Sequence, residues 1–130
     1  MLNSRLAYKI DTQRRLCLKK DLIELSQWIS AVENYNRELD YLGVLEKQLV
    51  RSATIAANMQ GLRRKNTLTM GLLCKYEQQL KSELEYGDRE YDLSRAKEHE
   101  KKRDIYGAIN NEFIQLKIDM YKRLSNFKLS

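Results

Sequence analysis

The segment Gln60-Gly61-Leu62-Arg63-Arg64-Lys65-Asn66-Thr67 lies almost at the midpoint of this 130-residue chain. Gly61 can adopt the left-handed conformation that ends a helix. Asn66 or Thr67 can cap the next helix, because a short side-chain oxygen accepts a hydrogen bond from the free amides of a first turn. We therefore predict a turn over residues 61–66, at the tip of a long antiparallel helical hairpin.

The composition favours long helices. The chain has no proline and five glycines, and it is rich in the strong helix formers Ala, Leu, Glu, Lys, Gln and Arg. Charged residues make up 32% of the sequence, too many for a deep globular core, so helices that each bury one stripe fit better. The predicted fold class is all-α: one elongated domain over residues 1–130, an oligomeric hairpin or coiled-coil bundle. Its helices are expected over about 4–60 and about 67–127.

Apolar residues repeat at steps of four and three along both predicted helices, which places them on one face of each. Asp11 and Asp21 are local break signals, so a kink within residues 11–21, or a fold-back there into three helices, is an alternative. Other apolar residues lie off the stripes, and we expect a second copy or a partner protein to cover them. The core or oligomer stripe comprises Leu22, Leu25, Ile29, Val32, Leu39, Ile105, Ile109, Phe113, Leu116 and Met120.

The charge is unevenly distributed around a formal net value of +6. Residues 1–20 carry six cations and one acid, and residues 61–66 carry three cations and no acid. Clustered cations suit contact with an anionic membrane or partner, although a solvated rod with uneven charge is the alternative. Acids are interleaved elsewhere, so we do not expect nucleic-acid binding. The candidate contacts are Arg14, Arg15, Lys19, Lys20, Arg63, Arg64 and Lys65.

No arrangement typical of catalysis is present in the sequence. The single histidine, His99, lies in a charged run, and we interpret it as part of a solvated helix face. The Glu-x-x-His spacing of a diiron bundle is absent, since Ala96 stands three residues before His99. There is also no phosphate loop, zinc spacing or nucleophile elbow. We expect no enzymatic activity, no cofactor and no bound metal.

The hydropathy of the sequence indicates where in the cell the protein is expected. No stretch approaches the roughly 20 apolar residues that a membrane span needs. The segment Met1-Leu2-Asn3-Ser4-Arg5 lacks the apolar run of a signal peptide. We therefore expect a cytoplasmic protein, with peripheral membrane association as an option.

Several motifs of the chain resemble a sorting-nexin BAR domain. The segment Glu38-Leu39-x-x-Leu42-x-x-Leu45-Glu46 is similar to the first helix of that family. The later helices are matched by Tyr76-Glu77-x-x-Leu80, Glu85-Tyr86, Leu93-x-x-Ala96-Lys97, Ile109-x-x-Glu112-Phe113-x-x-Leu116-Lys117, Lys122-Arg123-Leu124 and Phe127.

The resemblance implies a crescent-shaped dimer that binds curved endosomal membranes through cations, with residues 88–104 as a helix-rich tip. The chain is short for the family's three long arms. Our expectation is a non-enzymatic coiled-coil scaffold, or a BAR-like protein of vesicle trafficking that dimerises and contacts anionic membrane. The alternative is a helical-hairpin assembly or chaperone subunit of a larger complex, such as a stalk-like protein of type III export or a subunit of a cytoskeletal or tethering complex.

Overall fold

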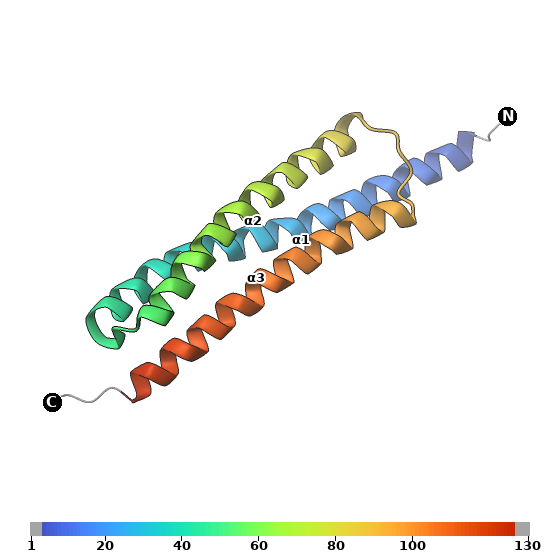
Figure 1. Cartoon of the computed structure of the whole chain (residues 1–130). Coiled ribbons are helices and arrows are strands. Elements are labelled where there is room, and N and C mark those ends of the chain that lie inside the picture. Colours follow the sequence, from blue (N-terminus) through green and yellow to red (C-terminus); the bar gives the residue numbers. More distant parts are fainter. Residues whose placement is uncertain (1–3, 127–130) are drawn as a thin grey trace.

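The computed structural model describes residues 4–126 as three helices joined by two short connections (Figure 1). α1 spans Ser4–Leu45 and continues into a π-helical turn, η1, over Glu46–Val50. α2 spans Ala53–Tyr86, and α3 spans Leu93–Ser125. No strand occurs among these residues, so the predicted all-α class is confirmed.

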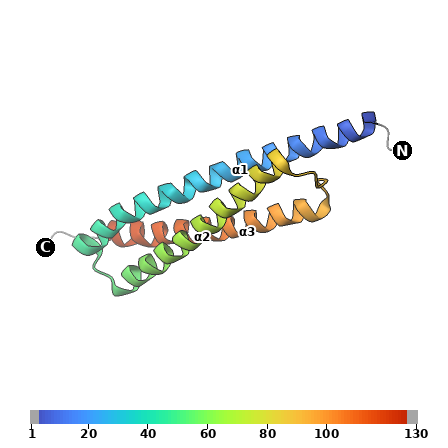
Figure 2. The same cartoon turned by 90° about the horizontal axis from the view of Figure 1, so that it is seen from above.

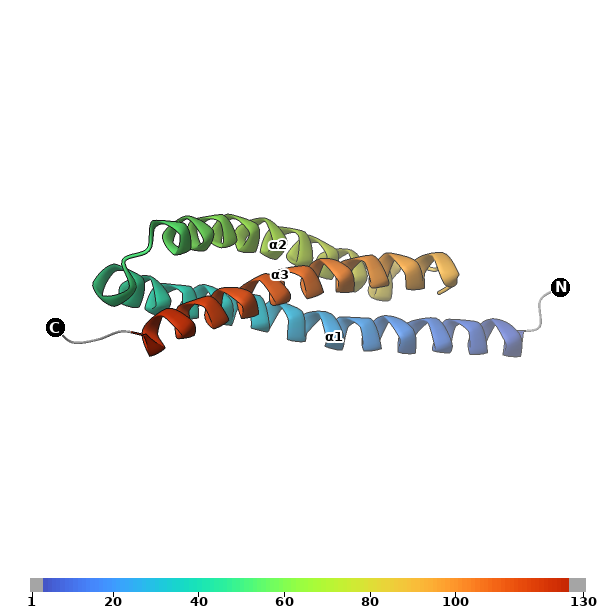
Figure 3. The ribbon, with the colours of Figure 1, turned by 60° about the horizontal axis from the view of Figure 1, so that its bottom comes forward.

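The three helices form an elongated bundle in which α2 runs antiparallel to both α1 and α3 (Figures 1 and 2). α1 has 42 residues and α2 has 34, which correspond to lengths of about 63 and 51 Å. The first turns of α1 consequently project past the connection between α2 and α3 (Figure 3). The first and last described residues lie at opposite ends of the bundle, and do not meet as a two-helix hairpin would require.

The first connection lies at residues 51–52, ten residues before the predicted turn. Arg51 adopts the left-handed conformation, with φ 48° and ψ 49°, and its amide donates to the Glu46 carbonyl. Ser52 then caps α2, since its side-chain oxygen accepts from the Ile55 amide at 3.3 Å. A left-handed arginine is uncommon, so glycine-based reasoning does not find this turn.

The second connection covers residues 87–92. Gly87 ends α2 and donates its amide to the Glu83 carbonyl. A Cβ atom at Gly87 would lie 2.7 Å from that carbonyl oxygen, so a larger residue would displace the chain here. Asp92 caps α3, because its carboxylate accepts from the Arg95 amide at 3.0 Å.

The predicted turn over residues 61–66 is wrong, and so is the prediction of single helices over 4–60 and 67–127. Residues 61–66 are interior to α2, where Gly61 has open space around it and is tolerated. Asn66 is fully buried, and its amide nitrogen donates to Asn36 Oδ1 at 3.0 Å. The alternative of a break within 11–21 is also wrong, because α1 is continuous there.

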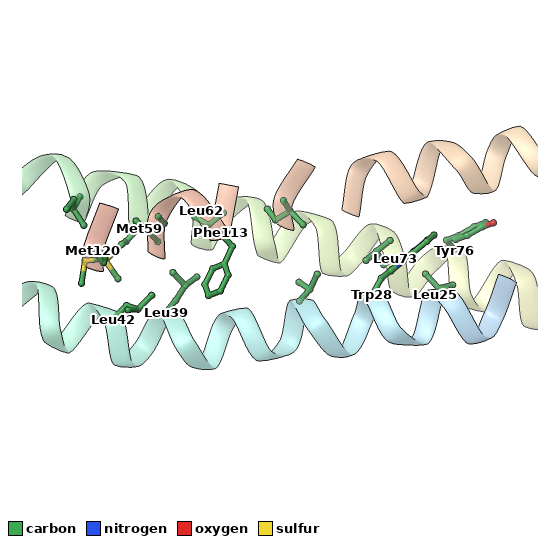
Figure 4. Packing of buried hydrophobic residues seen from close by; sticks show 14 of the residues in the cluster. Leu25, Trp28, Leu39, Leu42, Met59, Leu62, Leu73, Tyr76, Phe113 and Met120 are labelled. Atoms are coloured by element: carbon green, nitrogen blue, oxygen red, sulfur yellow. The ribbon is translucent and has the colours of Figure 1, made fainter. Parts of the chain in front are cut away.

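The core lies where the three helices face one another along the length of the bundle (Figure 4). Its buried apolar side chains come from all three helices, which makes α3 a full member of the bundle. They are Leu18, Leu25, Trp28, Val32, Leu39 and Leu42 of α1; Ile55, Met59, Leu62, Leu73, Tyr76 and Leu80 of α2; and Ile109, Phe113, Leu116 and Met120 of α3. Within residues 4–126, no helix combines the length and apolar character needed to cross a bilayer.

Candidate functional site

The only histidine of the sequence lies inside the bundle. His99, in the second turn of α3, is 2% exposed. Its ring stacks on Trp28 of α1, with 5.0 Å between centroids, and lies 5.7 Å from the Tyr76 ring of α2. The interpretation of His99 as part of a solvated face is therefore wrong. The position lies on the inward side of α3, ten residues before buried Ile109 and four after buried Arg95.

Both ring nitrogens of His99 have polar neighbours. Nε2 lies 2.6 Å from Glu24 Oε1 and 3.5 Å from Asp21 Oδ1. Nδ1 lies 2.7 Å from the Tyr76 hydroxyl. Burial raises the pKa of Tyr76, so this phenol keeps its proton at neutral pH and can donate to Nδ1. Nε2–H then donates to Glu24, which gives a complete hydrogen-bonded chain from α2 through α3 to α1.

The carboxylates of Asp21 and Glu24 also contact side chains other than His99. Asp21 and Glu24 are three residues apart on α1, so both face α3. Arg103 donates to Glu24 from Nε at 3.0 Å and from Nη2 at 2.7 Å. This guanidinium contact is the main cause that lowers the pKa of Glu24. The Tyr91 hydroxyl donates a hydrogen bond to Asp21 Oδ2. Burial is the main cause that raises the pKa of Tyr91, and this hydrogen bond is the second cause.

A second ionic layer closes this end of the bundle. Arg95, which is almost fully buried, pairs with Glu83 of α2 and with Glu98 at 2.6 Å. Arg14 of α1 is 4% exposed and donates to the Glu83 carbonyl at 3.0 Å and to Asp11 at 3.0 Å. The polar groups that face one another here come from every helix and satisfy one another.

Asp21, Glu24 and His99 are the one group of described residues whose donor atoms could together hold a metal ion. One oxygen of each carboxylate and one ring nitrogen all lie within 4.8 Å of one another. Two carboxylates and an imidazole form a ligand set suited to divalent transition metals. The chemistry that this cluster offers is cation binding and proton exchange.

The predicted anionic-contact residues do not form one surface. Arg14 is buried, so its assignment as a contact is wrong. Arg63 pairs with Asp40 at 2.9 Å, and Lys65 pairs with Glu112 of α3 at 2.8 Å. Arg64, between them, is exposed, and successive residues of a helix point in directions about 100° apart. Arg15, Lys19 and Lys20 are exposed on α1.

The predicted core stripe lies in the core except at one position. Leu25, Val32, Leu39, Ile109, Phe113, Leu116 and Met120 are buried, and Leu22 and Ile29 pack against them. Ile105 is 36% exposed and lies outside this core, where neighbouring Tyr106 packs instead; an oligomer contact at Ile105 stays a prediction. The true α3 stripe runs at steps of four and three backwards from Met120 through Tyr106 to His99 and Arg95. That spacing is the signal that could have placed His99 inside.

A shallow groove follows the outer side of the α2–α3 contact. One part, of about 310 Å³, is lined by Ala57, Gly61 and Leu62 on one side and Leu116 on the other. A second part continues past the Lys65–Glu112 pair to Leu68 and Ile105, both of which are exposed.

No family model, no curated protein and no solved structure matches the chain.

Proposed function

We propose that the chain is a non-enzymatic helical scaffold that works by self-association through the projecting end of α1. Residues 4–13, which we call the α1 overhang, are all exposed, and they precede Arg14, which contacts the last turn of α2. The overhang carries Leu6 and Ile10. This exposed helical segment with an apolar face is the observation that carries the proposal.

The apolar face of the overhang continues the core-facing side of α1. Each step of four residues turns about 40° round the helix, so Ile10 lies close to the side of buried Arg14, and Leu6 lies about 40° further round beside it. Arg14 and Leu18 are covered by the bundle, whereas Leu6 and Ile10 lie past the end of α2. The overhang extends α1 without tertiary packing of its own, and most helical stability in proteins comes from such packing, so a partner surface that buries these side chains would stabilise it.

A second copy of the chain is the partner that this geometry favours. Two overhangs packed antiparallel would cover each other's Leu6 and Ile10 in an isologous contact, the usual arrangement of homodimers. Burial of one such side chain contributes about 1.5–3 kcal/mol, and two-fold symmetry uses each side chain twice. Only one acid, Asp11, accompanies Arg5 and Lys9 in the overhang, so the association should tighten as salt screens like charges.

The test compares two single changes in the same overhang. Tyr8 lies on the opposite side of the helix from Leu6 and Ile10 and is 72% exposed. We expect Ile10→Asp to weaken the dimer by at least about tenfold in light scattering, and Tyr8→Asp to leave it nearly unchanged. A wild-type chain that is monomeric up to about 100 μM would contradict self-association. Equal effects of the two changes would contradict the assigned face.

Contact with anionic membrane is the second candidate function, and the outer face of α1 favours it. Exposed Leu16 and Ile23 lie there beside exposed Lys19 and Lys20. A helix face that mixes apolar groups with cations is suited to the headgroup boundary of a bilayer. This is the function implied by the resemblance to sorting-nexin BAR domains, and it would make the chain a BAR-like protein of vesicle trafficking.

Flotation with phosphatidylserine vesicles tests this candidate. Lys19→Gln with Lys20→Gln should weaken binding by about thirtyfold at low salt, because each cation near the surface contributes about 1 kcal/mol. The matched control, Arg63→Gln with Lys65→Gln, removes the same charge from cations that are already paired. Equal loss in both doubles would indicate a nonspecific charge effect. A chain that neither floats nor dimerises, but purifies with a partner protein, would favour a subunit of a larger assembly.

A further inference from the structure

Three metal-ligating atoms from two helices converge beside Trp28. The side chains of His99 and Asp21 are 3% and 9% exposed, and that of Glu24 is 32% exposed. Asp21 Oδ1 lies 3.5 Å from His99 Nε2, close to the separation of about 3.3 Å between neighbouring ligand atoms around tetrahedral zinc. The sequence separation of 75 residues between Glu24 and His99 hides this arrangement from any local motif.

The groups behind these atoms fix their orientation. The Tyr76 hydroxyl, 2.7 Å from Nδ1, sets the ring so that Nε2 faces both carboxylates. Tyr91 binds the far oxygen of Asp21, which turns Oδ1 towards the imidazole. Outer contacts of this kind, to the second nitrogen of a histidine and the second oxygen of a carboxylate, are typical of metal sites.

We propose that Asp21 Oδ1, Glu24 Oε1 and His99 Nε2 bind one divalent transition-metal ion, Zn²⁺ being the best fit. Two carboxylates and a neutral imidazole carry a charge of −2, which the ion balances. Three protein ligands leave one tetrahedral position to water. The ion would join α1 to α3 at the end of the bundle where the 87–92 connection lies.

Metal binding competes with two contacts that Glu24 already makes, one with His99 Nε2 and one with Arg103. The 2.6 Å contact between Nε2 and Glu24 Oε1 is a hydrogen bond, so the imidazole must change tautomer as the ion enters: Nε2 gives its proton to solvent and Nδ1 takes one up, which keeps the ring neutral. Nδ1–H can then donate to the Tyr76 oxygen. Glu24 must withdraw from Nε2 by under about 1 Å to reach zinc geometry. Arg103, which is 49% exposed, can swing into solvent when Glu24 turns to the ion.

Because Arg103 competes for Glu24, the change in zinc affinity on removing Arg103 distinguishes a metal site from a salt-bridge network. Arg103→Gln removes a rival for Glu24 but none of the three ligands, so it should tighten zinc binding. Lys101→Gln removes the same charge from an exposed position of the same helix and should leave the affinity unchanged. If the cluster were only a salt-bridge network, Arg103→Gln would loosen the fold and create no affinity.

The experiment uses the full chain, stripped with a chelator and titrated with Zn²⁺ in a calorimeter. We expect one saturable site per chain and a rise in the melting temperature with zinc. Glu24→Gln and His99→Gln should each weaken binding by about tenfold or more. Circular dichroism checks that each variant is folded. If His99→Gln does not fold, Arg103→Gln, which changes an exposed side chain, still tests the proposal.

Cobalt identifies the ligands. Co²⁺ bound by Asp21, Glu24 and His99 should give visible absorption without the intense near-ultraviolet band of a thiolate ligand. A thiolate band that disappears in Cys17→Ser or Cys74→Ser would place the ion on a cysteine and overturn the proposal. No saturable zinc site in the folded wild-type chain would overturn it as well, as would binding that is indifferent to both Glu24→Gln and Arg103→Gln.

Discussion

Near η1 the three helices meet through Leu39, Met59 and Phe113, whereas near the 87–92 connection they meet through Glu24, Tyr76 and His99. We call these regions the apolar half and the polar half. Apolar contacts have little directional preference of their own, and the first region resists a shift along the axis through the interdigitation of its side chains. A hydrogen-bonded chain tolerates no such shift without leaving buried groups unpaired, so the second region fixes how the helices are aligned.

The Asn36–Asn66 contact lies between the two halves. Asn66 is fully buried, and its Oδ1 is the single buried side-chain nitrogen or oxygen atom of the described residues without a hydrogen-bond partner. A polar pair on an otherwise apolar stripe is a known way of setting the relative position of two helices. It lies on the α1–α2 interface, while the histidine cluster joins all three helices. The alignment of α3 therefore depends on the polar half together with the bond between Tyr35 of α1 and Asn110 of α3.

The largest expected loss of stability comes from a substitution in the apolar half. Phe113 is buried and stacks on Tyr35, with 4.4 Å between ring centroids. Phe113→Ala should lower the free energy of unfolding by about 3–5 kcal/mol, measured by urea denaturation. The matched control is Ile114→Ala, next in sequence but 47% exposed, which should stay within about 0.5 kcal/mol. Similar losses in both variants would contradict the packing described for α3.

An intermediate loss of stability is expected from a substitution in the polar half. Arg95→Met removes the buried partner of Glu83 and should cost about 3 kcal/mol, because an unpaired carboxylate is left behind. Adding Glu83→Met should recover part of this loss, since the pair is then replaced by apolar groups of similar size. Additive losses in a double-mutant cycle would show that the two residues do not interact.

The smallest effect tests a polar contact placed inside the apolar half. The Tyr35 hydroxyl bonds Asn110 and lies 3.3 Å from the Tyr106 hydroxyl, so Tyr35→Phe should cost about 1 kcal/mol. Burial raises the pKa of Tyr35 above its ordinary value of 10.0. Its contribution is thus fully present below pH 10.0 and is lost as the pH rises towards the folded pKa. Tyr35→Phe should flatten the alkaline side of the stability profile; an unchanged profile would contradict this.

The apolar stripes along the bundle were predictable from sequence. Leu25, Val32 and Leu39 follow one another at steps of seven, as do Ile109 with Leu116 and Phe113 with Met120. Such spacing fixes which side of a helix faces inward whatever lies opposite. It does not fix where the helices end. Gly61 offers a helix-ending signal but lies inside α2, while Arg51 makes the left-handed turn without glycine.

The polar half could not be read from composition, because burial of charge depends on partners distant in sequence. His99 stands between Glu98 and Glu100, and nothing local distinguishes this run from a solvated face. Only the tertiary structure brings Glu24 to its Nε2 and Tyr76 to its Nδ1. If the steps of four and three along α3 are continued from Phe113 back to His99, they place the histidine on the buried side of the helix. They do not identify its partners.

The odd number of helices has a mechanical consequence. Because α1 and α3 run in the same direction, the beginning of α1 and the end of α3 lie at opposite ends of the rod (Figure 1). A stretching force applied at these two points acts along the helix axes, and loads the interfaces of the bundle in shear. A two-helix hairpin pulled by its adjacent ends would instead unzip one turn at a time. Such a force would therefore meet the resistance of all the helix interfaces together.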